Sequence, residues 1–222
     1  ERRTWTGLHL LDGRWVLEAN PSDTGETVDA VRRLLRLSQA RFDVLAAEQN
    51  DAAENIMAFW GPRALNLASP TMSVGGLLTP SPVTHQGLSA GAVARATLEN
   101  AAFAMRECSE LLESVLAKNA EMSGARDQAI SLSGGMSQSR VFPQMLASVL
   151  GTPVLLHTPL ATAAGAAIAV SRATGEWMQT AHDARGKALL IEPDPHDALR
   201  HDERYRRWLS LREWLDSLAD EL

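Results

Sequence analysis

The spacing of apolar residues changes along the chain, and each change predicts a different element. Two short apolar runs flank Asp12-Gly13, a dipeptide typical of tight turns, and this pattern predicts a β-hairpin over residues 4–18. Apolar residues then recur at near-helical spacing, which predicts a helix over residues 26–48. Residues 50–90 are rich in proline and glycine and carry few charges, so we expect a long irregular segment there.

The second half of the chain alternates between strand and helix patterns. A long amphipathic pattern predicts a helix over residues 90–117, and Ser89 is placed to cap its first turn. The shorter elements that follow are a strand at 129–132, a helix at 141–150, a strand at 153–157 and a helix at 161–173. A polar connector and a terminal amphipathic helix come last. This alternation predicts an α/β fold with helices packed on a sheet.

Composition narrows the class of protein. The chain has 222 residues, of which 45% are apolar and 22% charged, as expected for one globular domain. No apolar run is long enough to cross a membrane, and no signal peptide is apparent. Cys108 is the only cysteine, which excludes an internal disulfide and favours a cytoplasmic location. A net charge of -6 without a basic run argues against nucleic acid as a partner.

The strongest local candidate for a binding site is Ser133-Gly134-Gly135-Met136. It joins a predicted strand to a predicted helix, and in α/β folds ligands bind at this end of the strands. Glycines let a ligand approach the backbone, and free N–H groups at a helix start favour an anion. The segment matches neither a Walker phosphate loop nor a Rossmann fingerprint. An ordinary tight turn between strand and helix remains the alternative.

A second motif, Gly87-Leu88-Ser89-Ala90-Gly91, fits the pattern of a hydrolase nucleophile elbow. The elbow requires a strand directly before the serine, whereas residues 79–86 are predicted to be loop. Ser89 is therefore better explained as a helix cap. A serine hydrolase that uses Ser89 stays open as a less favoured hypothesis.

Several side chains are expected to have structural roles only. Cys108 is expected to pack as a small apolar residue within the long helix. We expect packing roles in the last helix for Trp208 and Trp214, and solvent exposure for a group of basic residues near the C-terminus. These basic residues are His196, His201, Arg204, Arg206 and Arg207.

Five segments, taken in order, point to a known family. They are Trp15-Val16-Leu17-Glu18 with Thr24-Gly25-Glu26-Thr27-Val28-Asp29; Phe59-Trp60-Gly61-Pro62-Arg63; Arg95 to Phe103; Ser133-Gly134-Gly135 through Val154; and Ala163-Ala164-Gly165-Ala166-Ala167. In this order they resemble the C-terminal domain of the FGGY carbohydrate kinases, which belong to the actin-like ATPase superfamily. The resemblance spans about residues 5–210.

The resemblance implies a ribonuclease H-like α/β fold whose mixed sheet carries helices on both faces, with residues 1–222 as a single domain. It also implies phosphorylation of a sugar or polyol hydroxyl, with ATP or ADP and Mg²⁺ as cofactors. By position, three groups of residues would bind the nucleotide. Gly134, Gly135 and Met136 would line the adenosine, Ser139 would contact the base, and Gly25, Val28 and Asp29 would line the opposite side. No catalytic or metal-binding residue is carried over.

The chain also departs from the family pattern. Pro62 stands where the loop usually has glutamate, Asn100 where the long helix has glycine, and Met136 where the turn has a smaller residue. The family's phosphate-binding turn, sugar domain and catalytic aspartate are expected before Thr4. We therefore expect an N-terminally truncated domain, inactive alone and at most a weak nucleotide binder.

Two questions stay open at this point. A nucleotide-binding or interaction module that kept this fold and lost the chemistry is an alternative to a kinase domain. The apolar residues between 64 and 90 could pack against the missing domain or against a second copy of the chain, so a homodimer is also open.

Overall fold

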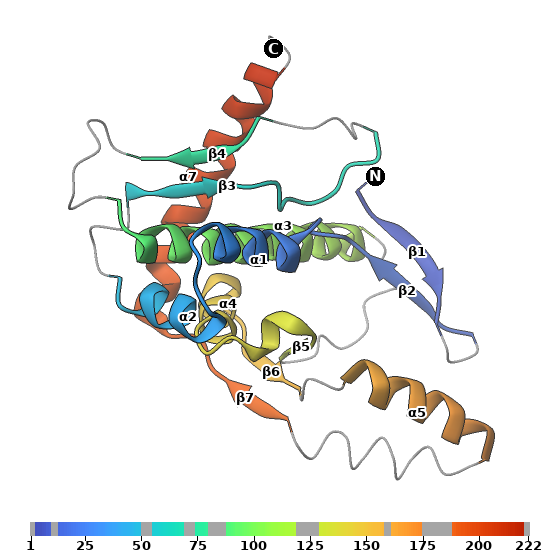
Figure 1. Cartoon of the computed structure of the whole chain (residues 1–222). Coiled ribbons are helices and arrows are strands. Elements are labelled where there is room, and N and C mark those ends of the chain that lie inside the picture. The colour runs from blue at the N-terminus through green and yellow to red at the C-terminus, as the bar shows by residue number, and fades with distance from the viewer. Residues whose placement is uncertain are drawn as a thin grey trace.

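The computed structural model describes residues 3–9, 13–49, 55–68, 74–79, 88–118, 129–157, 161–174 and 188–219, and the statements below concern these ranges (Figure 1). The elements in chain order are β1 (Trp5–Leu8), β2 (Trp15–Glu18), α1 (Thr24–Leu34), α2 (Gln39–Ala47), β3 (Met57–Phe59), β4 (Gly76–Leu78), α3 (Ala90–Ala117), β5 (Ile130–Leu132), η3 (Gly135–Gln138), α4 (Phe142–Leu150), β6 (Val154–Leu156), α5 (Ala161–Thr174), β7 (Leu189–Ile191) and α7 (Pro195–Ala219).

The described strands form three small sheets. β1 pairs with β2 and β3 pairs with β4, both antiparallel. In the third sheet β6 lies between β5, to which it is parallel, and β7, to which it is antiparallel. The predicted α/β class and the mixed sheet are confirmed. The strands do not all join one sheet, because β3 packs on α3 and pairs there with β4.

Helix α3 forms the centre of the fold. It packs against α1, α2, α4 and β3, and Figure 1 shows it crossing the middle of the molecule. Small buried residues such as Ala94 and Ala102 let these neighbours approach closely. At Gly91 a Cβ atom would lie 2.6 Å from the Leu45 carbonyl oxygen of α2, so this contact between α2 and α3 requires glycine.

Aromatic side chains join α7 to this centre. Trp208 is almost completely buried, and its ring stacks on Phe59 of β3 with 6.2 Å between the centroids. Phe103 of α3 lies 5.8 Å from the Trp208 ring and 5.7 Å from the Tyr205 ring. Burying rings of this size contributes strongly to stability. The C-terminal helix therefore completes the main core.

The predicted helix over 26–48 is wrong as a single element, because the chain breaks between α1 and α2. Arg36 adopts φ 56°, in the left-handed region that ends many helices. The Leu37 amide bonds back to the Arg32 carbonyl at 3.1 Å, and Ser38 then begins α2 by accepting the Arg41 amide at 3.3 Å. No glycine or proline marks this break in the sequence.

Two segments predicted to be irregular contain regular structure. β3 and β4 lie within residues 50–90, where Met57 pairs with Leu78 and Phe59 with Gly76. β7 lies within the predicted polar connector. Pro195 is the first residue of α7, a position that suits proline because the first helical N–H has no partner inside the helix.

The packing expectations are confirmed in part. Cys108 and Trp208 are buried as predicted, and Arg206 and Arg207 are exposed. Three expectations are wrong: Trp214 is 54% exposed, whereas His201 and Arg204 are buried. The last two share one helix face with Tyr205 and Trp208, at three- and four-residue spacing. Because the segment is rich in basic residues, its sequence did not indicate that this face of the helix is buried.

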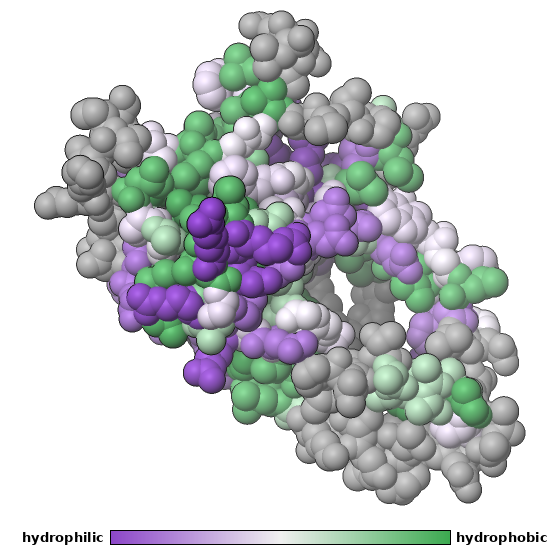
Figure 2. Space-filling model, viewed as in Figure 1, coloured by the Kyte–Doolittle hydropathy of each residue, from purple (hydrophilic) through white to green (hydrophobic). Residues whose placement is uncertain are grey.

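The surface of the face shown in Figure 2 is mixed. Hydrophilic residues gather over α1, where the Asp29 carboxylate pairs with Arg32 and Arg33. None of the described helices has a stretch both long and apolar enough to span a membrane.

Candidate functional site

The Gly-Gly turn follows directly from strand β5. Gly134 has φ 90° and ψ -166°, a combination essentially restricted to glycine. Its carbonyl accepts the Ser137 amide at 3.2 Å and the Ser137 hydroxyl at 2.6 Å, which closes the turn into η3. The predicted order of strand, tight turn and helix is thus observed, with η3 placed before α4.

The space above the turn is open. At Gly134 and Gly135 an added Cβ atom would have no described neighbour within 4 Å. Gly135 does not have a positive φ, so neither backbone conformation nor packing requires glycine there. Met136 is half-buried against the main core. The turn therefore leaves its backbone accessible to a ligand.

Ser139 has a structural role in this turn. Its hydroxyl donates to Oδ1 of Asp43 at 3.0 Å and accepts the amides of Val141 and Phe142 at 3.2 and 3.1 Å. These bonds use its proton and both lone pairs. A bond from this hydroxyl to a nucleotide base would require one of them to break, so the predicted base contact stays a prediction.

The three predicted residues of α1 face different surroundings. Gly25 is exposed, and a Cβ atom added there would meet no described atom within 4 Å. Val28 is 4% exposed and packs in the main core, which leaves only its backbone for a ligand. Asp29 accepts bonds from Arg32 at 2.7 Å and Arg33 at 3.0 Å, and the hydrogen bond from Arg32 lowers the pKa of this carboxyl.

The structure does not join α1 directly to the Gly-Gly turn. Within the described ranges, no hydrogen bond or ion pair connects α1 with residues 133–140. The link to the turn comes instead from α2, through Asp43. Sequence reasoning missed this carboxylate, since an acidic residue within a helix gives no signal of a partner almost a hundred positions away.

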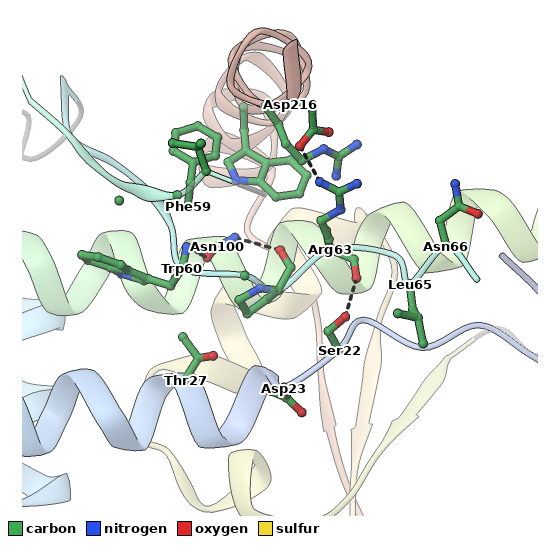
Figure 3. A pocket seen from close by; sticks show the side chains of 17 residues that line it. Ser22, Asp23, Thr27, Phe59, Trp60, Arg63, Leu65, Asn66, Asn100 and Asp216 are labelled. Atoms are coloured by element: carbon green, nitrogen blue, oxygen red, sulfur yellow. Dashed lines mark hydrogen bonds and ion pairs between the residues drawn. The ribbon is translucent and has the colours of Figure 1, made fainter. Parts of the chain in front are cut away.

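A separate pocket of about 580 Å³ lies at another place in the fold (Figure 3). Its walls come from the start of α1, the loop after β3, the start of β4, the middle of α3 and the second half of α7. They include Trp60, Trp208 and the ion pair between Arg63 and Asp216, 2.6 Å apart. None of the seven predicted nucleotide-binding residues lines it. The sequence did not predict this pocket, because its walls come from segments that lie far apart in the sequence.

Asn100 and Pro62, two departures from the family pattern, are in direct contact. The Asn100 side chain accepts the Trp60 amide at 3.0 Å and donates to the Pro62 carbonyl at 3.2 Å. Asn100 is 1% exposed, so these bonds are shielded from water. The asparagine therefore fixes the loop that carries the proline.

The contacts of Ser89 are those of a helix cap. Its hydroxyl accepts the Ala92 amide at 3.0 Å and donates to Oε1 of Gln49 at 3.1 Å. No described histidine shares a hydrogen bond with it. The prediction of an N-cap is confirmed, and the described residues offer no base that would activate Ser89 as a nucleophile.

Comparison with known proteins first defines the class, which is that of the carbohydrate kinases. The model of the FGGY family of carbohydrate kinases, C-terminal domain, matches residues 4–174. The chain belongs to this family.

Curated relatives are considerably longer than this chain. Glycerol kinase 1 of Streptomyces avermitilis is 28% identical over 215 residues, which cover 93% of this chain and 39% of that protein. The glycerol kinase of Chloroflexus aurantiacus is 31% identical over 171 residues, covering 75% of this chain and 32% of the relative. A ribulokinase of Mycolicibacterium smegmatis is 27% identical over 230 residues, covering 92% of this chain and 38% of that protein.

Solved structures show the same fold. The xylulose kinase from Rhodospirillum rubrum superposes with a TM-score of 0.76 at 25% identity, covering 99% of this chain and 44% of that one. The Plasmodium falciparum glycerol kinase, whose structure was solved with ADP, superposes with a TM-score of 0.70 at 13% identity, covering 94% of this chain and 42% of that one. The predicted family and fold are confirmed.

Proposed function

We propose that this chain is the nucleotide-binding domain of an ATP-dependent carbohydrate kinase. The observation that carries the proposal is the Gly134–Gly135 turn, which follows β5 and has open space above its backbone. Family membership supports it, and so does the ADP in the solved glycerol kinase of the same fold. An α/β domain binds ligands in this position, beyond the carboxyl end of a strand.

Each predicted residue takes a role that its surroundings allow. Gly134 and Gly135 present their backbone to the adenosine, since no described side chain covers it, and Met136 lines the same side. We propose that Gly25 and Asp29 line the opposite side of the nucleotide, with Val28, which is buried in the core, contributing only its backbone. Ser139 acts through the shape of the turn rather than through a free hydroxyl.

The reaction of the whole kinase would be in-line transfer of the terminal phosphoryl group of ATP to a sugar or polyol hydroxyl. Mg²⁺ would accompany the nucleotide and neutralise charge on its phosphates. In the described part of this chain no three His, Cys, Asp or Glu side chains are grouped to hold a metal, so we assign no step to a protein-bound ion. We propose that these residues position the nucleotide and neither make nor break a bond.

A titration of ADP tests the nucleotide site. NMR detects binding in the millimolar range, and we expect the 222-residue chain to bind ADP through residues 133–139. Gly135→Val should weaken binding about tenfold or more, because the side chain occupies the open space. Gly7→Val is the matched control, since it makes the same substitution in β1, where an added Cβ atom would meet a single neighbouring atom at 3.9 Å. Equal binding by wild type and Gly135→Val would refute the site.

An assay of ADP release tests the division of roles. We expect no sugar-dependent turnover of ATP by this chain with glycerol, xylulose or ribulose. Phosphorylation of any pentose, hexose or polyol by the purified chain would show that its own residues complete the reaction.

A further inference from the structure

Asp43 is a buried carboxylate, and each of its two oxygens accepts a hydrogen bond from a residue directly after the Gly-Gly turn. It lies on α2 and is 2% exposed. Its Oδ1 accepts the Ser139 hydroxyl at 3.0 Å and the Gln39 side-chain amide at 3.0 Å. Its Oδ2 accepts the backbone amide of Arg140 at 2.9 Å. One carboxylate therefore holds two consecutive residues at the end of the turn.

These bonds determine the direction of the Ser139 hydroxyl. Because its proton points to Asp43, its lone pairs are left for the amides of Val141 and Phe142 at the start of α4. A continuous set of hydrogen bonds thus runs from α2 through the turn into α4. Such networks fix geometry more firmly than separate bonds do.

The helix that carries Asp43 is itself firmly placed. Phe42 and Ala46 of α2 are fully buried, and α2 approaches α3 closely at Gly91. A buried carboxylate is costly unless donors satisfy it, so it tolerates little displacement of the groups it binds. Asp43 consequently anchors the end of the exposed Gly-Gly turn to a helix that is packed in the core.

We propose that Asp43 is a positioning residue, which holds the Gly134–Ser139 turn in the conformation that binds the nucleotide. This inference rests on the proposed function, and it adds a residue that does not itself touch the ligand. Asp43→Asn keeps the size of the side chain but supplies one acceptor oxygen in place of two. The amide can no longer satisfy both Ser139 and Arg140 as the carboxylate does.

The first experiment measures ADP affinity by NMR titration at a temperature where every variant is folded. We expect Asp43→Asn to weaken binding about tenfold, because a turn that samples other conformations binds less tightly. Glu99→Gln is the matched control, since Glu99 is also a buried, hydrogen-bonded carboxylate, 3% exposed, but bonds to α7 instead of the turn. Its affinity should stay within about twofold of wild type. Equal weakening in both variants, or none in either, overturns the inference.

The second experiment measures amide hydrogen exchange without ligand. In Asp43→Asn, exchange at Arg140 and its neighbours in the turn should become faster, while the centre of α3 keeps its protection. Should Asp43→Asn fail to fold, Ser139→Ala removes the bond from the turn to Oδ1 of Asp43 and carries the same expectation for affinity. In this variant faster exchange is expected at Val141 and Phe142, whose amides bond the Ser139 hydroxyl.

The two measurements separate the inference from the proposed function. A wild-type chain that binds no ADP refutes the proposed function and the role of Asp43 in binding. Unchanged exchange at Arg140 in Asp43→Asn, or at Val141 and Phe142 in Ser139→Ala, refutes the positioning itself, whatever the affinity.

Discussion

Arg204 of α7 binds Glu99 of α3 inside the protein, across 105 positions of sequence. The Arg204 Nε atom donates to Oε2 of Glu99 at 3.1 Å, and Nη2 reaches the Ile56 carbonyl at 3.0 Å. The other carboxylate oxygen of Glu99 accepts from Arg95 at 3.3 Å. Both side chains of the pair are less than a tenth exposed. The pair thus attaches the C-terminal helix to the central helix.

We expect Arg204→Met to lower the free energy of unfolding by about 3–5 kcal/mol, because it leaves Glu99 buried with less compensation. Urea denaturation measures the change. Arg206→Met is the control: Arg206 also pairs with an acid, Asp202, but is 72% exposed, so its loss should cost less than about 1 kcal/mol. Similar costs for the two variants would contradict a buried, structural pair.

The pH dependence of stability should report His201. Burial lowers the pKa of this histidine to about 4, although Glu99 opposes the shift, and its Nδ1 atom lies 3.9 Å from Oε1 of Glu99. The unfolded chain takes up a proton on this histidine near pH 6.5, whereas the folded chain does not. The contribution of neutral His201 to the free energy of unfolding is therefore fully present above pH 6.5. It declines as the pH falls from 6.5 towards 4.

Between pH 7 and pH 5 this group alone should remove about 2 kcal/mol of stability. Urea denaturation of wild type and His201→Gln at the two pH values isolates the effect, since the variant lacks the titrating group. We expect the loss of stability to be smaller in the variant by that amount. An identical loss in both proteins would show that His201 titrates alike in the folded and unfolded states.

Local signals were sufficient to predict part of the fold. Helix α3 begins at Ala90 behind its Ser89 cap, as its sequence predicts, because capping and apolar spacing act within a few residues. The break at Arg36 was not predictable in this way, since arginine rarely takes a left-handed conformation and nothing nearby marks it.

In the candidate site, too, one feature could be predicted from local sequence and others could not. The Gly134–Gly135 turn could be predicted from the sequence, because the backbone angles of Gly134 are essentially restricted to glycine. Asp43 is not, because its role arises only when α2 packs beside the turn. The pocket between Trp60 and Asp216 is likewise formed by tertiary packing of distant segments.

The thiol of Cys108 should be protected from reagents in the folded protein. It is 6% exposed on α3, and burial raises its pKa to about 12. Since the thiolate is the reactive form, we expect negligible reaction with a thiol reagent at pH 8 within minutes. Guanidinium should release one reactive thiol per chain, which is the control. Rapid labelling of the native protein would show that this part of α3 opens easily.

Asn100 should stabilise the loop after β3 through its two side-chain bonds to Trp60 and Pro62. Asn100→Ala leaves the Trp60 amide and the Pro62 carbonyl without these partners, and we expect it to cost about 2–3 kcal/mol in urea denaturation. Exchange at the Trp60 amide should also become faster. Asn66→Ala is the control, because Asn66 makes one exposed bond, to the Ala68 amide at 3.0 Å, and its loss should cost less than about 1 kcal/mol.

Asn100→Gly tests the same site with the residue that the family usually has there. It loses the same two bonds and adds the cost of glycine within a helix, so it should be about 1 kcal/mol less stable than Asn100→Ala. Combining Asn100→Gly with Pro62→Glu introduces both family residues together. Since Asn100 and Pro62 are in contact, we expect the combined cost to differ from the sum of the single costs by about 0.5 kcal/mol or more. Strict additivity would mean that the two departures are energetically independent.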